Sequence, residues 1–555
     1  MFISNKRPHM KKNSVIVLLC MILVTNIAAQ GINIIPKPAS VEPGNGYFDL
    51  TKATTFSYTQ QGIENSTSFF NGYLKKYYGF NLPVKKMKLS GPNKIILRYS
   101  DQVALPAGGY ILKVMPSGVE ISAHDQTGVF YGIQSLIQLL PTQVSASLSL
   151  PCATIIDSPR FAYRGLHLDC GRHFFSVDFI KQYIDFIALH KMNIFHWHLT
   201  EDQGWRIEIK KYPLLTSVGG CRNGTIIGHK PGTGNDGEKE CGYYTQDQIR
   251  DVVKYAADRY ITIIPEIEMP GHASAAIAAY PQLSCFPGES TLIDPTTPWA
   301  GPRTGKQVQQ TWGVFPDVFA PTDYTFTFLE NVLDEVMNLF PSKYIHIGGD
   351  ECPKTNWKRS AYCQQFMKEH GISDEEGLQS YFIQRIEKYV NSKGHAIIGW
   401  DEILEGGLSP NATVMSWRGE KGGIAAAELH HQVIMSPTTY VYFDYAQSKQ
   451  EDSLTIGGYL PVESVYNYEP FSRELSPADA KYIIGAQANV WSEYMSNPRK
   501  VEYMIFPRLS ALSEVLWCQP ENKNWDDFKI RLQTQFKRYD LWKVDYNTHG
   551  IDKGE

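Results

Sequence analysis

Several absences narrow the classes of protein to which this sequence can belong. None of the nine cysteines forms a Cys-x-x-Cys pair, which leaves little support for a thiolate zinc site or thiol redox chemistry. No Gly-x-Gly-x-x-Gly loop follows an early strand pattern, which argues against a dinucleotide-binding sheet. Basic residues form no cluster that would suit nucleic acid, so we expect no nucleic-acid partner.

Long apolar runs are also missing, and the one near the start is typical of a targeting segment. Four basic residues precede the apolar run from Val15 to Val24, and the small residues Ala28 and Ala29 follow it. This order predicts a signal peptide over residues 1–29, because the run is too short to span a bilayer. Without those four basic residues, 49 basic side chains face 57 acidic ones, a net charge of −8. We therefore expect an exported protein (periplasmic, cell-surface or secreted) with no transmembrane segment after signal removal.

Eight cysteines remain after the predicted signal peptide, an even number that permits disulfides in an exported chain. Two pairs each bracket one loop and are locally plausible: Cys221 with Cys241, and Cys352 with Cys363. Free buried thiols are an equally good interpretation, because pairing does not follow from sequence alone.

After the predicted signal peptide, the hydrophobic and turn patterns of the sequence divide the chain into three parts. Residues 30–157 read as a small α+β domain, with a hairpin of 110–115 and 119–123 around Pro116-Ser117-Gly118. A helix with apolar residues at helical spacing follows from Gly128 to Leu140. Residues 158–520 alternate short apolar strands with amphipathic helices, and residues 521–555 form a C-terminal helix expected to pack on the outside of the barrel.

The middle part predicts a (β/α)₈ barrel, so the fold class is α/β. Eight strands are expected at 163–168, 193–198, 261–267, 344–348, 396–400, 414–417, 432–436 and 483–490. Capping boxes at Thr245 and Ser373 and Pro477 after Ser476 mark helix starts, and Gly394 marks a helix end. Eight strands with intervening helices over roughly 350 residues suit a barrel better than an open doubly wound sheet.

The fourth strand, Tyr344–Gly348, ends in a glycine pair that is followed by Asp350 and Glu351. An ordinary turn would also use such residues, but glycines let a backbone approach a ligand closely. Each of the other barrel strands likewise runs out into Trp, Tyr, His or carboxylate residues. Since ligand chemistry in a barrel collects at the carboxyl ends of the strands, these residues predict one site.

Two chemistries could use such a set of residues. His196, His198, His272 and Asp350 resemble a metal site for metal-assisted hydrolysis. However, His196 and His198 bracket a Trp and no further His follows on strands five to eight, which favours hydrogen-bonded structural histidines. Glycoside hydrolysis needs aromatic faces for the sugar and a carboxylic acid that protonates the leaving oxygen. Adjacent acids suit a reaction in which one protonates the bond while the other holds a 2-acetamido group that itself attacks. We therefore favour substrate-assisted glycoside hydrolysis, with no metal and no organic cofactor.

The sequence resembles glycoside hydrolase family 20, the β-N-acetylhexosaminidases, across the barrel and more loosely across the small domain. The resemblance rests on these motifs in order: Arg164-Gly165-x-His167-x-Asp169, Arg172-His173-Phe174, His196-Trp197-His198-Leu199-Thr200, Asp202-Gln203-Gly204-Trp205-Arg206, Pro270-Gly271-His272, His346-x-Gly348-Gly349-Asp350-Glu351, Gly399-Trp400-Asp401-Glu402, Ser416-Trp417-Arg418-Gly419 and Asn489-x-Trp491-x-Glu493.

The resemblance implies a catalytic role for three residues. Glu351 is expected to be the general acid/base, and Asp350 to orient the acetamido N–H and balance an oxazolinium intermediate. Tyr442 is expected to hold the acetamido carbonyl, although Tyr440 lies two residues away and would face the same side of a strand.

The resemblance also implies substrate-binding and supporting residues. The expected walls of the sugar pocket are Trp400, Trp417 and Trp491, and the expected contacts to hydroxyl groups are Arg164, Asp444 and Glu493. Asp202, His198 and His272 are expected to orient and tune Glu351 from behind, and Glu201 stands where many relatives carry a second Asp. The implied partner is a glycan with a terminal N-acetylhexosamine. The alternative from another class is a non-catalytic sugar-binding relative.

Overall fold

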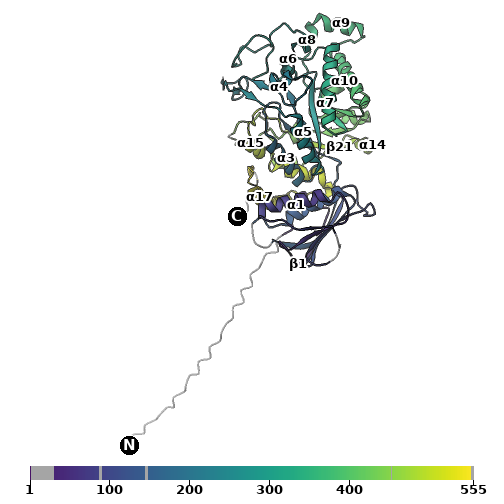
Figure 1. The fold of residues 1–555 in the computed structure, drawn as a ribbon, viewed down its shortest axis with the longest axis vertical. Helices are drawn as coiled ribbons and strands as arrows, with labels where there is room; N and C mark the ends of the chain where they lie inside the picture. Colours follow the sequence, from purple (N-terminus) through teal and green to yellow (C-terminus); the bar gives the residue numbers. More distant parts are fainter. Residues whose placement is uncertain (2–30, 87–90, 144–147, 452, 550, 552–555) are drawn as a thin grey trace. The chain divides into compact units, whose positions relative to one another are not determined.

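The computed structural model describes residue 1 and residues 31–86, 91–143, 148–451, 453–549 and 551. The signal peptide predicted for residues 1–29 therefore lies almost wholly outside the described residues, and export stays a prediction. Residues 33–555 form one compact unit (Figure 1). Within the described residues, every helix is too short or too polar to cross a membrane.

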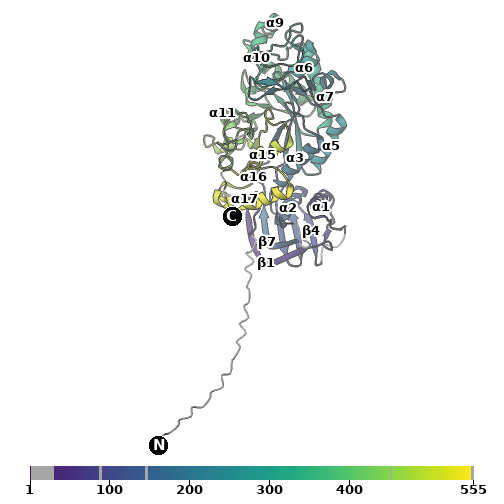
Figure 2. The ribbon, with the colours of Figure 1, turned by 90° about the vertical axis from the view of Figure 1, so that its left-hand side faces the viewer.

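The small domain is built on one seven-stranded sheet with the strand order β1-β7-β5-β6-β4-β2-β3. Helices α1 and α2 lie against this sheet (Figure 2). The domain's elements are β1 Ser40–Leu50, β2 Thr55–Ser57, α1 Glu64–Tyr78, β3 Val84–Lys85, β4 Lys94–Tyr99, β5 Tyr110–Met115, β6 Gly118–Ala123, α2 Gln126–Leu139 and β7 Leu148–Asp157. The predicted hairpin is confirmed, since β5 and β6 pair antiparallel with Met115 opposite Gly118.

A closed barrel of eight strands follows, with the order β16-β17-β18-β19-β20-β21-β8-β9 and parallel pairing throughout. The strands are β8 Tyr163–Asp169, β9 Ile194–His198, β16 Thr262–Met269, β17 Tyr344–Gly348, β18 Ala396–Trp400, β19 Thr413–Ser416, β20 Val433–Met435 and β21 Ile483–Ala488. All eight predicted strands are present to within about two residues at their ends, so the (β/α)₈ prediction is confirmed.

The longer helices pack around the barrel because each has an apolar face to bury. The helices from α3 onward are α3 Val177–Leu189, α4 Leu214–Ser217, α5 Gln246–Ala257, α6 Ser274–Ala279, α7 Asp323–Leu339, α8 Thr355–Arg359, α9 Ala361–Glu369, α10 Glu375–Ser392, α11 Lys421–Glu428, α12 Thr438–Val441, α13 Val462–Tyr466, α14 Pro477–Ala480, α15 Pro498–Ile505, α16 Arg508–Trp517 and α17 Trp525–Trp542. Short strand pairs lie in the loops: β10 Thr200–Glu201 with β11 Gly204–Trp205, β12 Cys221–Arg222 with β15 Glu240–Cys241, and β13 Ile226–Ile227 with β14 Gly234–Asn235.

Two of the three predicted helix starts are confirmed. Thr245 and Gln248 form a capping box at α5, and Ser476 caps α14 with Pro477 at its first position. The capping box predicted at Ser373 is wrong by one residue. Asp374 caps α10 instead, because its carboxylate accepts a hydrogen bond from the Gly377 N–H at 2.8 Å.

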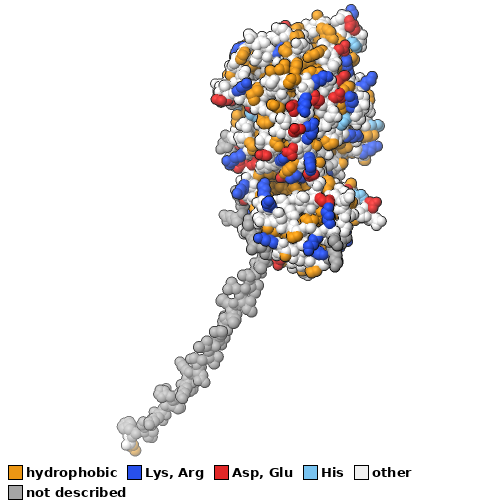
Figure 3. All heavy atoms as spheres, viewed as in Figure 1, with side chains coloured by type: hydrophobic (Ala, Val, Ile, Leu, Met, Phe, Trp, Pro, Cys, Tyr) orange, Lys and Arg blue, Asp and Glu red, His pale blue; other side chains and the backbone are white. Residues whose placement is uncertain are grey.

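The C-terminal helix α17 contacts both the barrel and the small domain. Arg531 donates two hydrogen bonds to Glu514 of α16, and Arg538 donates to the backbone carbonyl of Gln138 in α2. A buried ion pair between Lys191 and Asp157, 2.9 Å apart, adds a second tie between the small domain and the barrel. On the face drawn in Figure 3, basic and acidic side chains are interspersed over both parts.

One of the two cysteine pairs suggested by the sequence is a disulfide. Cys221 and Cys241 are bonded and join β12 to β15. The pair Cys352 and Cys363 is wrong, because both are free thiols in a hydrophobic cluster around Trp357. The Cys363 sulfur lies 3.9 Å from that of Cys285 instead.

Candidate active site

A pocket of about 210 Å³ opens where the barrel strands end. This volume lies below the ~300–1,000 Å³ usual for drug-sized ligands, so the pocket suits a small one. Its lining combines carboxylates, one guanidinium and a set of aromatic rings: Arg172, Glu201, Asp350, Glu351, Trp400, Trp417, Thr438, Tyr442, Asp444, Tyr445, Ile456, Trp491 and Glu493. Eight of the twelve residues proposed from the sequence are among them.

The two glycines at the end of β17 shape the turn that delivers the acids. Gly348 and Gly349 have φ of 66° and 91°, values that favour glycine, and a Cβ on Gly348 would overlap the Glu268 carboxylate. Glu351 itself has a φ of 43°, a strained conformation of the kind that collects at functional sites. As a result the neighbouring side chains diverge: Asp350 is buried, whereas the Glu351 side chain is 39% exposed.

His272 lies behind both acids. Its Nε2 atom is 3.6 Å from a carboxylate oxygen of Asp350 and of Glu351, and its Nδ1 atom is 2.8 Å from Glu201 and 3.1 Å from Asp202. Burial favours the neutral ring, but Glu201 and Asp202 outweigh burial and raise the pKa of His272 well above its ordinary value. The resulting imidazolium, acting first through hydrogen bonding, lowers the pKa of Glu351. The shared proton thus resides on His272, 3.6 Å away, and the Glu351 carboxyl favours its ionised form in the absence of substrate.

Aromatic rings form the walls of the pocket, and two of them are held by buried carboxylates. The Trp400 indole N–H donates to Glu266 and that of Trp417 donates to Glu402, each at 2.8 Å. The Trp417 ring stacks against Tyr442 at 6.2 Å between centroids, and Trp400 lies 5.8 Å from Trp491. Glu402, which the sequence placed only in the motif that follows Trp400, has a pKa raised to about 8, first by burial and then by Asp350.

The structure distinguishes the two candidate tyrosines. Tyr442 lines the pocket. Its backbone is held by an isolated parallel β-bridge to Asn489, the residue after β21. Tyr440 turns away and stacks on Tyr468 with ring centroids 4.8 Å apart. Of these two tyrosines, Tyr442 is therefore the one placed to contact a ligand in the pocket.

Arg164 is not in the pocket, and the prediction that it grips the substrate is wrong. It is the second residue of β8, and its guanidinium donates to Lys191 O, Phe161 O and Tyr131 Oη at 2.6–2.9 Å. Asp169 is five residues further along the strand, about 17 Å away at roughly 3.3 Å per residue. Arg164 therefore lies at the opposite end of the barrel, where it bonds to the small domain.

Arg172, from the loop after β8, occupies the place expected for Arg164. Its guanidinium lies 3.3 Å from Asp169, 3.2 Å from Glu201 and 3.5 Å from Glu493, and 5.1 Å from the centre of the Trp491 ring. The sequence contained one indication of this placement. Arg172 follows the first barrel strand, whereas Arg164 is near the beginning of that strand, and barrel sites lie at the carboxyl ends of the strands.

Four buried polar atoms at the pocket lack a hydrogen-bond partner within the described residues. They are Arg172 Nε, Asp350 Oδ1, Asp444 Oδ1 and Glu493 Oε2. Burying a polar atom without a hydrogen-bond partner costs free energy. Because all four atoms belong to residues that line one pocket, they indicate a ligand that supplies the missing partners. Burial also raises the pKa of Asp444 and of Glu493, in each case helped by a neighbouring carboxylate. A polyhydroxylated ligand offers both donors and acceptors to such a set.

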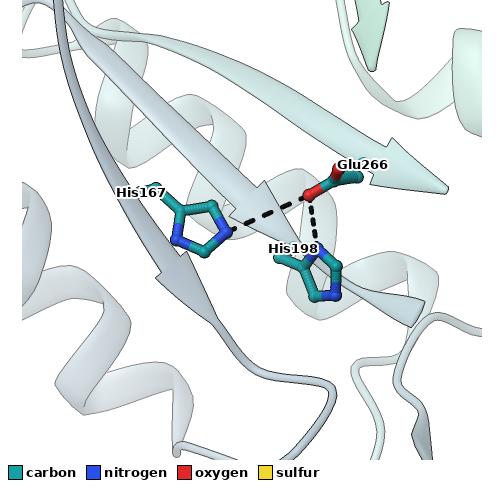
Figure 4. A group of neighbouring side chains, drawn as sticks. All are labelled: His167, His198 and Glu266. Atoms are coloured by element: carbon teal, nitrogen blue, oxygen red, sulfur yellow. Dashed lines mark hydrogen bonds and ion pairs between the residues drawn. The ribbon is translucent and has the colours of Figure 1, made fainter. Parts of the chain in front are cut away.

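The histidines of the barrel interior gather around Glu266. Its carboxylate contacts His198 Nδ1, lies 3.2 Å from His196 Nε2 and 2.8 Å from His346 Nδ1, and His167 is 4.0 Å away (Figure 4). Burial lowers the pKa of His196 to about 4, whereas Glu266 and Glu201 overcome burial and raise the pKa of His198 to about 10.

These donor atoms are close enough to be considered as metal ligands: His167, His198 and Glu266, or His196, Glu266 and His346. A metal ion holding two such atoms at ~2 Å needs them about 3 Å apart. The 2.8 Å between His346 Nδ1 and Glu266 is shorter than that and is an ordinary hydrogen-bond length, which favours a hydrogen-bonded arrangement for this pair. The expectation of no metal stays a prediction.

Comparisons with known proteins agree with this geometry. Residues 161–520 match the model of the glycosyl hydrolase family 20 catalytic domain, and residues 31–158 match that family's domain 2. A beta-hexosaminidase of Porphyromonas gingivalis is 44% identical over 527 residues, which cover 93% of this chain and 64% of that protein. A beta-hexosaminidase of Vibrio furnissii is 35% identical over 492 residues, covering 87% of this chain and 76% of that protein.

A solved structure of a family 20 enzyme has a similar fold. The GH20 exo-β-N-acetylglucosaminidase of Vibrio harveyi, in complex with N-acetylglucosamine, superposes with a TM-score of 0.82 at 31% identity. The match covers 93% of this chain and 78% of that one.

Proposed function

The chain belongs to glycosyl hydrolase family 20, and from that premise we propose that it is an exo-acting β-N-acetylhexosaminidase. It removes terminal, non-reducing, β-linked GlcNAc or GalNAc from glycans by substrate-assisted, retaining hydrolysis through an oxazolinium intermediate. One observation carries the proposal: adjacent Asp350 and Glu351 share His272 at 3.6 Å and face a pocket walled by Trp and Tyr.

In the proposed reaction, the acetamido group of the substrate is the nucleophile. Trp400, Trp417 and Tyr442 enclose it, and the Tyr442 hydroxyl holds its carbonyl oxygen. The unpaired Asp350 Oδ1 accepts the acetamido N–H and stabilises the positive charge that develops as the oxygen attacks C1. Glu351 donates its proton to the leaving oxygen and then, as a base, activates the water that opens the oxazolinium ring.

The polar end of the pocket supports exo action. Arg172, Asp444 and Glu493 approach one another there and are proposed to bind the outer hydroxyls of the terminal sugar. On the other side of Glu351 a second hollow of about 390 Å³, open to solvent, is lined by Glu351, Lys354, Gln379 and Arg418 among others. The proton donor thus stands between a pocket of about 210 Å³, proposed to hold one sugar, and a more open hollow for the leaving group.

The V. harveyi structure was solved with N-acetylglucosamine, which supports a 2-acetamido sugar as the ligand here. Turnover of a nitrophenyl 2-acetamido-2-deoxy-β-glucoside tests the proposal directly. A sugar-binding protein without activity would bind this compound and leave it intact, and that outcome would refute hydrolysis.

Substituting Arg172 and Arg164 in turn distinguishes an arginine in the pocket from one that stabilises the opposite end of the barrel. Arg172→Met is expected to raise KM and to lower kcat/KM about 10- to 100-fold, because hydrogen bonds to a charged group are lost. Arg164→Met is expected to lower the free energy of unfolding by about 3 kcal/mol, since three buried acceptors lose their donor, and to leave KM unchanged. Thermal unfolding and steady-state kinetics on both variants check this. A rise in KM for Arg164→Met with a normal KM for Arg172→Met would reverse the assignment.

Chelation is expected to leave activity unchanged. His196, His198 and His346 contact Glu266, and hydrogen bonding accounts for these contacts without an ion. Prolonged dialysis against a chelator, followed by rate measurements and elemental analysis, checks the prediction. Loss of activity with recovery on adding zinc would restore the metallohydrolase interpretation.

A further inference from the structure

Three free cysteines meet in the hydrophobic cluster around Trp357. Cys352 and Cys363 are buried members of this cluster, and Cys285 packs against it with a partly exposed side chain. The Cys285 and Cys363 sulfurs lie 3.9 Å apart and share a weak S–H···S hydrogen bond, although 78 positions separate them in the sequence. The fold has therefore brought two distant thiols side by side.

These two thiols lie in the segments that follow neighbouring barrel strands, β16 and β17. Cys285 lies just past the short helix η1 Pro281–Leu283, in the segment after β16 that also carries His272. Cys363 lies in α9, after the turn at the end of β17 that carries Glu351. His272 Nε2 and a Glu351 carboxylate oxygen are 3.6 Å apart. A covalent link between the two cysteines would therefore fasten together the two segments that set this distance.

Hydrogen bonds already hold the two segments together through the backbone around Phe319. The Phe319 N–H donates to Pro270 O at 2.9 Å, and the Phe319 carbonyl accepts the Trp357 indole N–H at 3.0 Å. The Asn356 amide donates to Pro316 O at 2.6 Å. Closing the gap between the sulfurs from 3.9 Å to the roughly 2.05 Å of a disulfide moves each sulfur by about 1 Å, a distance that side-chain rotation can supply.

The chemical setting favours oxidation of this pair. Cys221 and Cys241 are bonded, which indicates that the chain folds where thiols are oxidised. Hydrogen bonding with Cys285 lowers the pKa of the Cys363 thiol, and the thiolate is the form that attacks a disulfide. Cys352 shares the cluster and is the alternative partner for Cys363, so an experiment must tell the two pairs apart.

We propose that Cys285 and Cys363 form a second disulfide, produced by exchange with an oxidant that itself carries a disulfide. The partly exposed Cys285 forms a mixed disulfide with the oxidant, and one thiol of the oxidant leaves. The Cys363 thiolate then attacks the Cys285 sulfur, and the second thiol of the oxidant leaves. One S–S bond replaces two S–H bonds in the protein, and the two protons and two electrons pass to the oxidant.

Peptide mapping of the full chain tests the pairing directly. The protein is incubated with glutathione disulfide, alkylated in denaturant without a reductant, and digested. We expect mass spectrometry to find the Cys285 peptide joined to the Cys363 peptide, with Cys352 alkylated. Alkylation of both Cys285 and Cys363, a glutathione adduct retained on either of them, or a link that contains Cys352 would each overturn the proposal.

Thermal unfolding gives a second readout. A disulfide stabilises mainly by constraining the unfolded chain, and it does so more for a long loop. We expect a reductant to lower Tm in the wild type about 3–5 °C more than in Cys285→Ala, which keeps the Cys221–Cys241 bond. Comparing oxidised and reduced samples of one variant cancels the effect that the substitution itself has on packing.

Cys352→Ala is the matched control, since it removes a thiol from the same cluster and leaves the proposed pair intact. Its decrease in Tm on reduction is expected to equal that of the wild type. Equal decreases in the wild type and in Cys285→Ala would mean that the bond does not form, and a smaller decrease in Cys352→Ala would assign the bond to Cys352. Either result overturns the proposal. If a variant fails to fold, the peptide map of the unsubstituted protein decides.

Discussion

Glu351→Gln is expected to lower kcat on an unactivated 2-acetamido disaccharide by about 10²- to 10⁴-fold, the usual contribution of a general acid. The amide is nearly isosteric but cannot give a proton to the leaving oxygen. His272 lies 3.6 Å from Glu351 and cannot replace it, because the partly exposed Glu351 carboxyl alone faces both the pocket and the open hollow. The measurement is steady-state release of monosaccharide.

The leaving group provides an internal control for that prediction. A nitrophenolate departs with little protonation, so the loss on a nitrophenyl glycoside is expected to be much smaller than on the disaccharide. Glu376→Gln, an exposed carboxyl in the first turn of α10, is the matched surface control and should retain full activity. Disaccharide hydrolysis by Glu351→Gln at the wild-type rate would remove Glu351 from the mechanism.

The second large effect concerns the nucleophile. If the substrate's acetamido oxygen attacks, the enzyme should cleave 2-acetamido glycosides with net retention and fail on the matching 2-hydroxy glycosides. Asp350→Asn is expected to lower kcat about 10²- to 10³-fold, because it removes the charge that balances the oxazolinium ion in a buried site. A thiazoline mimic of the cyclic intermediate should bind far more tightly than substrate.

Trapping decides between this mechanism and an enzyme nucleophile. Wild-type protein incubated with a slow fluorosugar is expected to show no added mass on any carboxylate. Asp444 and Glu493 line the same pocket and are the carboxyls to inspect, together with Asp350. A glycosyl ester on one of them, seen by mass spectrometry, would refute substrate assistance.

Much of the barrel was predictable because it follows from local patterns. Each strand is a short apolar run and each helix has an apolar stripe, and closing eight such units leaves the strand ends together. That is why Asp350, Trp400, Tyr442 and Glu493, which lie far apart in sequence, could be assigned to one pocket in advance. Boundaries were less certain, as the one-residue error at Asp374 shows, because neighbouring Ser and Asp can both cap a helix.

The errors share a cause, which is that they depended on contacts between distant segments. Arg164 and Arg172 both belong to motifs at β8, and only the direction of the strand places one at the barrel base and the other in the pocket. Cys352 and Cys363 are close in sequence, yet packing around Trp357 leaves them unbonded.

Local composition thus determined the barrel, its helices and the identity of most pocket residues, because strand and helix periodicities are properties of short segments. The tertiary structure alone decided that Arg164 bonds to the small domain, which of Tyr440 and Tyr442 lines the pocket, and that Glu201 contacts Arg172, His198 and His272 at once. The physical reason is that a hydrogen bond needs its atoms within about 3 Å. Only the closed barrel brings residues from different strands to that distance.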